Sequence, residues 1–401
     1  MNRLCPQTGL SIALAFLLFF VACQRTPPVT PPPPNSGNDS TSTGRTLPPT
    51  DTTQVYVLGW TNDSNVYWKN GVPVLLSTAP GVYTSGMCMV DSDVYISGGT
   101  YLTDSTFTPS YWHKNTWIPL QDTTNRALTY GIGVSGGNVY VAGTAQFNDK
   151  VGPLWGANLS PFSYAKYGTI AVCWTNGTAT LLPGNDFAFD VNGFGETGIS
   201  DYVNGIAVSG NDVYVTGASH QWQEGVPSTY HFAGYWKNGI FVDLPNNTDG
   251  VSTDSLVNKP LPTVTSVLVN GSDVYVTGYQ YSNNSPQAVY WKNGVLTTLS
   301  YASNATYAYA ICVSGNDVYV AGKYGISINV PQTLYWKNGA PVALEDNGND
   351  ATPTGIAVSG NDVYVVGQEL DDGTVNHALI WKNGVLTRFS NASGAQAIIV
   401  K

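Results

Sequence analysis

Two short phrases alternate along most of this chain, and they constrain its fold more than any other feature. The first phrase has the pattern V-Y-V-x-G and occurs seven times, with Ile96 replacing one valine. Its copies are Val55–Gly59, Val94–Gly98, Val139–Gly143, Val213–Gly217, Val274–Gly278, Val318–Gly322 and Val363–Gly367. A repeat of this kind indicates an array of equivalent supersecondary units rather than unrelated domains.

The second phrase has the pattern Y-W-K-N-G and alternates strictly with the first. Its seven copies, three of them variants, are Tyr67–Gly71, Tyr111–Asn115, Cys173–Gly177, Tyr235–Gly239, Tyr290–Gly294, Tyr335–Gly339 and Ile380–Gly384. Each repeat is expected to contain four strands. In the last repeat they are Gly355–Ser359, Asp362–Gly367, Ala378–Lys382 and Val385–Phe389. The dipeptides between the first two and the last two strands, Gly360-Asn361 and Asn383-Gly384, are strong signals for two-residue hairpin turns.

Seven four-stranded units predict an all-β fold, a seven-bladed β-propeller over residues 54–401. Apolar and β-branched residues occupy both the odd and the even positions of the strands, as expected when each sheet is covered on both faces. The first unit lacks its innermost strand, while Ala395–Lys401 reads as a strand without partners in its own unit. We therefore predict that the C-terminal strand completes the first blade and closes the ring, which removes an exposed sheet edge.

The first 53 residues have the features of an export signal followed by a tether. Residues 1–22 carry a basic start and an apolar run, which predicts a secretory signal peptide. Phe20-Val21-Ala22-Cys23 resembles the lipobox of bacterial lipoproteins, and this resemblance implies acylation of Cys23. An uncleaved single-span anchor is the alternative. Residues 23–53, rich in proline, threonine and serine, are expected to form a disordered spacer. Both alternatives predict a membrane-anchored cell-envelope protein, and the lipobox resemblance favours the outer membrane, on either face.

The tandem phrases resemble those of uncharacterised bacterial propeller lipoproteins with W-K-N-G repeats. The resemblance covers residues 54–401 and implies the propeller fold. The chain is more distantly similar to kelch repeats, in which a strand of the V-Y-V-x-G-G type also occurs. Only Gly98-Gly99 keeps the double glycine here, and the tryptophan lies on the third strand, so kelch functions are not carried over.

The composition and the motifs exclude some functions. The net charge is −10 and no basic stripe is present, so a nucleic-acid partner is not expected. Gly133–Gly137 matches the G-x-S-x-G pattern of hydrolases, but it falls on a hairpin instead of the strand-to-helix turn that a nucleophile needs. No motif for a cofactor or a metal ion is found, and an enzymatic activity is left open without being favoured.

The longest insertions between the repeated phrases fall in the third and fourth blades. In a four-stranded meander the longer connections share one face of the ring, where binding sites usually lie. The long segments are Thr144–Ile170, Gly184–Asn204, Ala218–Ala233 and Asn246–Val264. The candidate ligand-binding residues within them are Trp155, Tyr164, Tyr167, Glu196, Asp201, His220, Trp222, Glu224 and His231. Aromatic rings beside carboxylates suit sugars, so we predict a binding module for a glycan or a protein.

Several alternatives remain for this set of residues. The aromatic side chains would also serve to pack long loops against the ring. Glu196, Asp201 and Glu224 would suit a polysaccharide hydrolase or lyase if two carboxylates stood about 5–9.5 Å apart. His220, His231 and Glu224 have a weak spacing for a metal site, and none is predicted. A purely structural assembly subunit is the remaining alternative.

The recurring charged and aromatic residues are expected to belong to the scaffold. The aspartate before V-Y and the lysine of W-K-N-G should be cross-strand neighbours, and the repeated tryptophan should pack between blades. Cys88, Cys173 and Cys312 are expected to be buried thiols: the blades that carry Cys88 and Cys312 are not adjacent, which argues against a disulfide between them, and Cys173 stands alone on a third strand.

Overall fold

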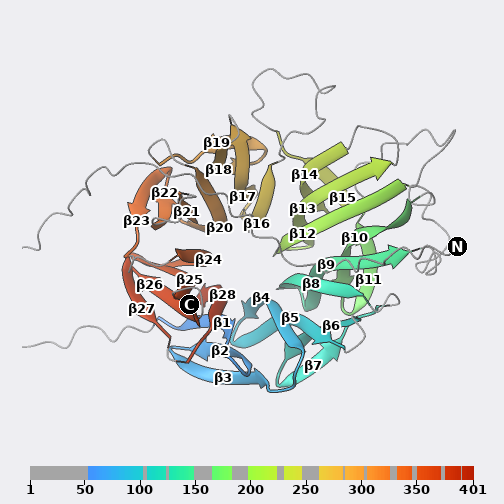
Figure 1. Ribbon diagram of the computed structural model, residues 1–401, viewed down its shortest axis with the longest axis horizontal. Helices are drawn as coiled ribbons and strands as arrows, with labels where there is room; N and C mark the ends of the chain where they lie inside the picture. The colour runs from blue at the N-terminus through green and yellow to red at the C-terminus, as the bar shows by residue number, and fades with distance from the viewer. Residues whose placement is uncertain are drawn as a thin grey trace, which may run out of the picture.

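A computed structural model shows a ring of strands around a central axis (Figure 1). It describes residues 53–102, 106–122, 126–148, 165–182, 197–223, 230–245, 262–282, 285–301, 305–325, 332–345, 350–371, 375–389 and 391–401. These residues form 28 strands, β1 to β28, and no helix. Accordingly, no helix capable of crossing a membrane occurs in the described part of the chain.

The strands form seven four-stranded antiparallel blades, which confirms the predicted fold class. The innermost strands are β28 (Gly394–Val400), β4 (Val82–Val90), β8 (Ala127–Ser135), β12 (Thr197–Ser209), β16 (Thr263–Asn270), β20 (Thr306–Ser314) and β24 (Asp350–Ser359). The second strands are β1 (Val55–Trp60), β5 (Asp93–Tyr101), β9 (Asn138–Asn148), β13 (Asp212–Gln223), β17 (Asp273–Ser282), β21 (Asp317–Tyr324) and β25 (Asp362–Asp371).

The outer half of each blade comes from the W-K-N-G phrase and the residues after it. The third strands are β2 (Asn65–Lys69), β6 (Phe107–His113), β10 (Ala165–Thr175), β14 (Tyr230–Lys237), β18 (Ser285–Lys292), β22 (Gln332–Lys337) and β26 (Val375–Lys382). The outermost strands are β3 (Val72–Ser77), β7 (Thr116–Pro119), β11 (Thr178–Leu182), β15 (Ile240–Asp243), β19 (Val295–Thr298), β23 (Ala340–Ala343) and β27 (Val385–Arg388). Several inner strands run further than predicted; β24, for example, begins at Asp350 rather than at Gly355.

The C-terminal strand closes the ring as predicted. β28 pairs antiparallel with β1, from Val55 opposite Val400 to Trp60 opposite Gly394. Beyond these strands, Gln54 and Lys401 exchange two main-chain hydrogen bonds of 2.7 and 2.9 Å. The first blade thus combines the beginning and the end of the propeller sequence, and β1 is paired along both of its edges, by β28 and by β2.

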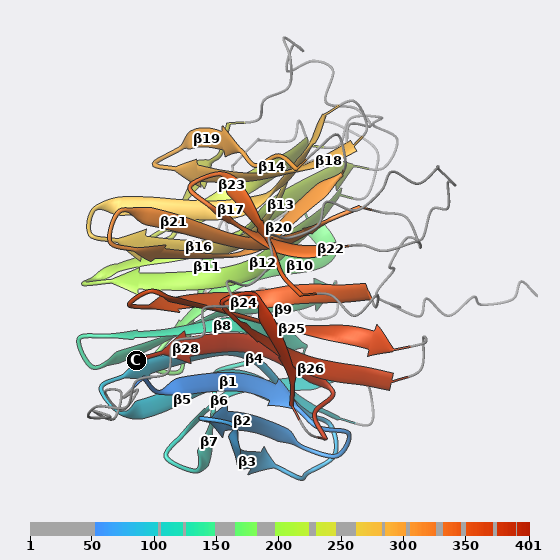
Figure 2. The same ribbon diagram turned by 90° about the vertical axis from the view of Figure 1, so that its left-hand side faces the viewer.

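The two-residue turns lie on one side of the ring, which we call the turn face (Figure 2). The strand ends that the longer connections join lie on the opposite side, the loop face. The third and fourth strands are joined by Asn-Gly in six blades and by Lys114-Asn115 in blade two, and Asn383 and Gly384 have φ angles of 53° and 87°. This left-handed conformation suits asparagine and glycine and matches the twist of a hairpin. The uniform phrases therefore build the turn face.

The repeated tryptophan packs between neighbouring blades, as predicted. Trp174, Trp236, Trp291, Trp336 and Trp381 are among the largest fully buried side chains. The Trp336 indole N–H donates to the carbonyl of Ser300, which follows the outermost strand of the preceding blade. Its ring lies against Gly322, where an added Cβ would approach it to 2.6 Å. The glycine that ends V-Y-V-x-G is therefore needed to admit the tryptophan.

Every innermost strand contains a β-bulge that sequence analysis did not predict. The residues left unpaired are Ser85, Tyr130, Asn204, Thr265, Tyr309, Thr354 and Gln396. Five of their side chains bond to the innermost strand of the next blade. Examples are Asn204 to the Val264 carbonyl at 2.7 Å and Thr354 to the Ala395 carbonyl at 2.8 Å. We call this circle of contacts the bulge belt, and tyrosines occupy its two other positions.

Blades three and four differ from the others because a main-chain ladder joins them. β10 pairs in parallel with β12, so the two blades form one eight-stranded sheet. β9, β10, β12 and β13 have 11, 11, 13 and 12 residues, against 8 to 10 in the first two strands of blades five to seven. The extra length carries the sheet toward the loop face, and we call the extended part of β9, β10, β12, β13 and β14 the ledge.

The three cysteines of the propeller are free thiols, as expected. Cys173 is buried, and Cys88 and Cys312 are partly buried. Burial raises the pKa of the Cys88 and Cys173 thiols to about 12, which leaves them protonated and unreactive at neutral pH.

Candidate functional site

The predicted binding residues lie partly on the ledge and partly outside the described residues. Trp155, Tyr164, Glu196 and Glu224 fall outside the described residues. The other five lie on strands, although sequence analysis placed them in loops: Tyr167 on β10, Asp201 on β12, His220 and Trp222 on β13, and His231 on β14. The lipidation residue Cys23 is also outside the described part.

Strand register brings four of these positions into two neighbouring rows. Tyr167 and Trp222 both pair with Gly198, from opposite sides of β12. His220 pairs with His231 on β14 and with Ser200 on β12. Adjacent strands are about 4.8 Å apart, so the Tyr167 and Trp222 backbones lie about 10 Å apart. Since 220 and 222, like 198 and 200, are two residues apart, all these positions share one face of the ledge.

Asp201 lies on the opposite parity and is only 1% exposed. Its Oδ2 accepts a 3.2 Å hydrogen bond from the N–H of Ala171, at the point where β10 and β12 separate. Burial raises the pKa of Asp201 to about 7, against the opposing effect of nearby donors that include Ala171. Within the described residues its Oδ1 has no hydrogen-bond partner. Asp201 thus lies at the end of the parallel β10–β12 pairing. Its carboxyl group is buried, whereas a residue in a surface loop would be exposed to solvent.

A cluster of aromatic side chains lies at the loop-face ends of blades two and three. It consists of Tyr83, Tyr101, Phe107 and Tyr130, and we call it the blade-two cluster. The Tyr83 and Phe107 rings lie 4.9 and 5.1 Å from the Tyr101 ring. Tyr101 is 48% exposed and Tyr130 38%. The Tyr83 hydroxyl accepts from the Thr129 N–H, and burial raises its pKa to about 12. The partly buried Tyr83 ring therefore packs against the exposed ring of Tyr101.

A second cluster lies at the loop-face ends of blades five and six. It consists of Tyr279, Tyr281, Tyr307 and Tyr309, and we call it the blade-five cluster. The Tyr279 ring lies 6.1 Å from that of Tyr281 and 5.0 Å from that of Tyr307. Burial, with a smaller contribution from neighbouring tyrosines, raises the pKa of Tyr307 to about 12, and burial likewise raises the pKa of Tyr309. The hydroxyls of Tyr307 and Tyr309 are therefore neutral donors at neutral pH.

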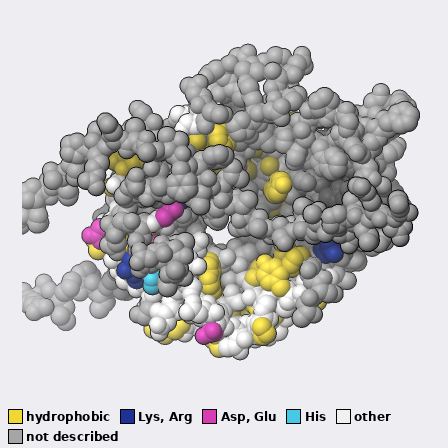
Figure 3. Space-filling view, viewed as in Figure 1, with side chains coloured by type: hydrophobic (Ala, Val, Ile, Leu, Met, Phe, Trp, Pro, Cys, Tyr) yellow, Lys and Arg dark blue, Asp and Glu magenta, His cyan; other side chains and the backbone are white. Residues whose placement is uncertain are grey.

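The two clusters lie on either side of the ledge along the ring, since blades three and four fall between them in chain order. Figure 3 shows the loop face, where side chains of the hydrophobic class, tyrosine included, are exposed around the centre. Sequence analysis missed both clusters because their residues lie inside repeat units. One signal was present: Tyr130 and Tyr309 replace the small polar or amide residues found at the other five bulge positions.

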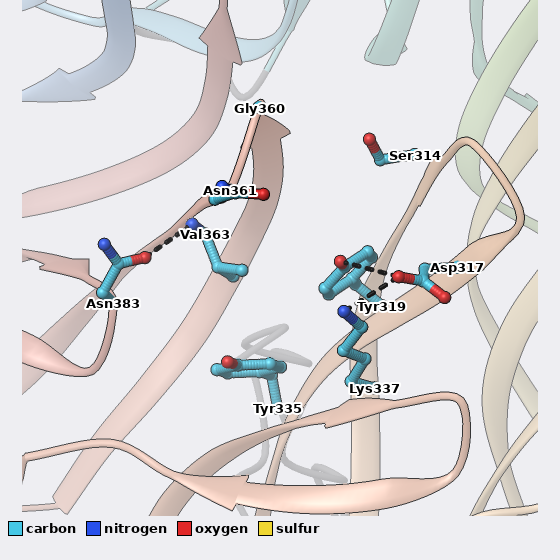
Figure 4. A pocket seen from close by; sticks show the side chains of 9 residues that line it. All are labelled: Ser314, Asp317, Tyr319, Tyr335, Lys337, Gly360, Asn361, Val363 and Asn383. Carbon is cyan, nitrogen blue, oxygen red and sulfur yellow. Dashed lines mark hydrogen bonds and ion pairs between the residues drawn. The ribbon is translucent and has the colours of Figure 1, made fainter.

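On the turn face, a pocket of about 300 Å³ opens between blades six and seven (Figure 4). Blade six contributes Ser314, Asp317, Tyr319, Tyr335 and Lys337, and blade seven contributes Gly360, Asn361, Val363 and Asn383. The Lys337 ammonium lies 2.8 Å from Asp317 and 5.2 Å from the centre of the Tyr319 ring. Hydrogen bonds from Lys337 and Asn338 hold the pKa of Asp317 below its usual range. The pair is therefore charged at neutral pH.

The predicted neighbour relation between the recurring aspartate and lysine is confirmed in four consecutive blades. The Lys–Asp distances are 3.0 Å for Lys237 and Asp212, 2.7 Å for Lys292 and Asp273, and 2.8 Å for Lys382 and Asp362, besides the pair in the pocket. No group of three histidine, cysteine, aspartate or glutamate side chains suited to a metal ion occurs among the described residues.

Comparisons with known proteins report likeness only at the level of solved structures. No family model and no curated protein sequence matches the chain. It is similar to a puromycin-hydrolysing peptidase of Mycobacterium tuberculosis, with 11% identity, a TM-score of 0.49, and coverage of 84% of this chain and 53% of that one. It thus spans about half the length of this peptidase.

Two further structures show comparable likeness. One is an ulvan lyase of polysaccharide lyase family PL25, with 8% identity, a TM-score of 0.43, and coverage of 83% of this chain and 86% of that one. The other is an acylaminoacyl peptidase of Pyrococcus horikoshii, with 10% identity, a TM-score of 0.42, and coverage of 77% and 46% respectively. At these identities no residue role is carried over to this chain.

Proposed function

We propose that this protein is a lipid-anchored component of the cell envelope whose propeller binds a glycan on its loop face. The observation that carries the proposal is the pair of tyrosine clusters on that face, with the ledge between them along the ring. The extended strand ends of the ledge lie on the same face. The uniform turn face shows no comparable elaboration.

The chemistry of the clusters favours a sugar ligand over a flat apolar partner. A tyrosine offers a ring that packs against the C–H groups of a pyranose and a hydroxyl that bonds to its oxygens. Tyr101 and Tyr130 expose 48% and 38% of their surface while Tyr83 holds the cluster in place. The blade-five cluster consists of four partly buried tyrosines. Two such platforms on one face would suit an extended polysaccharide better than a single small sugar.

The course of the chain leaves the loop face free for binding. β1 begins at the turn face, where Gln54 bonds to Lys401 beside the end of the ring. A tether formed by residues 23–53 would therefore leave from the turn face. With Cys23 acylated, the loop face would point away from the bilayer, at a distance set by about 3 Å per residue of an extended proline-rich spacer.

The test is binding to an array of envelope and algal polysaccharides by the full protein purified in mild detergent. Tyr101→Ala with Tyr279→Ala removes the exposed Tyr101 ring from one cluster and the partly buried Tyr279 ring from the other. We expect at least a roughly tenfold loss of affinity, since each stacked ring contributes on the order of 1 kcal/mol. Leu75→Ala with Val385→Ala, which trims exposed side chains on outermost strands, is the matched control. Unchanged binding by the tyrosine variant would refute the proposed site.

The same preparation addresses catalysis and anchoring. Release of reducing or unsaturated ends from a bound polysaccharide would favour the hydrolase or lyase alternative. Absence of any glycan binding by a cooperatively melting protein would favour a protein partner or an assembly role. Mass spectrometry of the processed N-terminus checks the anchor, since acylation should be found on Cys23 and vanish in Cys23→Ser.

A further inference from the structure

We infer that the turn-face pocket between blades six and seven is a second binding site, which holds one neutral sugar residue. Its position on the opposite face separates it from the loop-face site of the proposed function. The pocket has walls from two blades and a buried floor. Tyr319 and Tyr335 are 5% and 8% exposed and Val363 is 7% exposed, so their positions are fixed by packing.

The polar groups of the pocket form a partly satisfied network with bonding capacity left over. Asp317 accepts from Lys337, from the Tyr319 hydroxyl at 3.4 Å, and from Asn338 at 2.8 Å. Lys337 carries three N–H donors, of which the contact with Asp317 uses one. In the described part of the chain, the hydroxyls of Tyr335 and Ser314 have no hydrogen-bond partner. Figure 4 shows these groups around one open space, with Asn361 and Val363 on the opposite wall.

The charge of the pocket selects against ionic ligands. Asp317 and Lys337 neutralise each other, so neither an anion nor a cation gains a net attraction. What remains is a set of convergent hydroxyl, amide and ammonium groups. A neutral pyranose presents hydroxyls that both donate and accept, so it can satisfy these groups without carrying a charge. A volume of about 300 Å³ lies at the small end of the range for ligand pockets, so it suits one sugar residue.

The lysine, aspartate and two tyrosines of this pocket recur in blades four and five. Lys237 and Lys292 each lie 5.3 Å from the tyrosine ring of the same blade, Tyr214 or Tyr275. The second tyrosine is present there as Tyr235 and Tyr290. The inference therefore extends to three adjacent sites, between blades four and five, five and six, and six and seven. A ligand with repeated sugar residues would engage them together with increased avidity.

Natural variation between the blades supplies a substitution that the fold tolerates. The position of Tyr335 is occupied in blade seven by Ile380, which packs against the core beside blade one. Tyr235→Ile, Tyr290→Ile and Tyr335→Ile combined should therefore remove three hydroxyls and rings without unfolding the propeller. Tyr67→Ile in blade one is the control. There Gln54 replaces the aspartate and accepts from Tyr56 at 2.7 Å, so the charged pair is missing.

The experiment is saturation-transfer NMR on the full protein in mild detergent, with methyl glycosides of glucose, galactose, mannose and N-acetylglucosamine as probes. The background is Tyr101→Ala with Tyr279→Ala, which weakens the loop-face site, so that the comparison between the triple variant and this background reports on the turn-face pocket. We expect at least one glycoside to bind, about tenfold weaker in the triple variant and unchanged in Tyr67→Ile. No binding in the background protein, or equal binding by the triple variant, would overturn the inference.

Discussion

Blades five to seven and blades three and four are built on the same repeat but are joined in different ways. Between blades five and six, contacts are made by side chains: the buried Trp336, its indole hydrogen bond and the bulge belt. Between blades six and seven, the buried Trp381 and its indole hydrogen bond to the Glu345 carbonyl play this part. Blades three and four also share a main-chain ladder, which continues one sheet across the junction. The strands of a repeat can thus be lengthened where main-chain pairing reinforces the junction between two blades. The lengthening occurs only toward the loop face.

The largest expected effect concerns the side-chain junctions, because they hold the ring only while it is closed. Deleting residues 394–401 removes β28 and with it the contacts that Thr354 and Thr84 make across the first blade. We expect an insoluble protein, or a melting temperature lower by more than about 10 °C. Deletion of Lys401 alone removes only the terminal bonds and should melt within about 2 °C of the parent. Equal melting of both deletions would contradict closure by β28.

A second prediction tests the tryptophan of a regular junction. Trp336→Ala should lower the free energy of unfolding by about 3–5 kcal/mol, because it leaves a cavity between blades five and six. Chemical denaturation measures the loss, and hydrogen exchange should locate the increased opening in β16 to β23. Leu75→Ala on an outermost strand is the control. A loss under about 1 kcal/mol would mean that tryptophans do not hold these junctions.

A third prediction concerns the carboxyl group at the reinforced junction. Because the pKa of Asp201 is raised to about 7, the folded state keeps its proton where the unfolded state has lost it. The stability that Asp201 contributes is then fully present below about pH 4 and is lost as the pH rises to 7, by at most roughly 4 kcal/mol. Asp201→Asn keeps an acceptor for Ala171 and does not titrate.

The difference between the two proteins isolates the contribution of Asp201 from that of other carboxylates. In urea denaturation, Asp201→Asn should gain stability relative to wild type between pH 4 and pH 7 and keep a constant advantage above it. Parallel pH curves for the two proteins would show that Asp201 ionises normally in the fold.

The smallest effect is expected from the ion pairs of the regular blades. Asp317→Asn replaces a solvent-exposed partner of Lys337 and keeps the hydrogen-bonding shape of the side chain. The paired charges are screened by solvent, so the midpoint of thermal unfolding should not shift measurably. A clear drop would show that the repeated aspartates stabilise the ring, and would set the regular blades further apart from blade three, which lacks the pair.

The repeated phrases were sufficient to predict the regular blades. The number of strands per blade, the turn positions, the closing strand, the tryptophan packing and the Asp–Lys contacts all follow from V-Y-V-x-G and Y-W-K-N-G. They could be predicted because each residue has one local role, such as positive φ at Asn383 or ring burial at Trp336. Seven copies of each phrase make a wrong register easy to detect.

The parts that could not be predicted depend on residues whose identity varies. The bulge position holds serine, tyrosine, asparagine, threonine or glutamine, so no sequence pattern predicts the bulge belt. The segments around Tyr167, Asp201 and His220 lie outside the phrases, and nothing in them distinguished an extended strand from a loop. The parallel pairing of β10 with β12 joins separate blades, and pairing between units is not encoded by a local period.

The meeting of the two chain ends at the turn face also has a mechanical consequence. Any pull transmitted through the residues before Thr53 acts first on β1, along the direction of that strand. β1 is held on one side by β28 and on the other by β2, so the load spreads over two antiparallel ladders in shear rather than opening one bond at a time. A ring sealed in this way resists extraction by the segment that would anchor it.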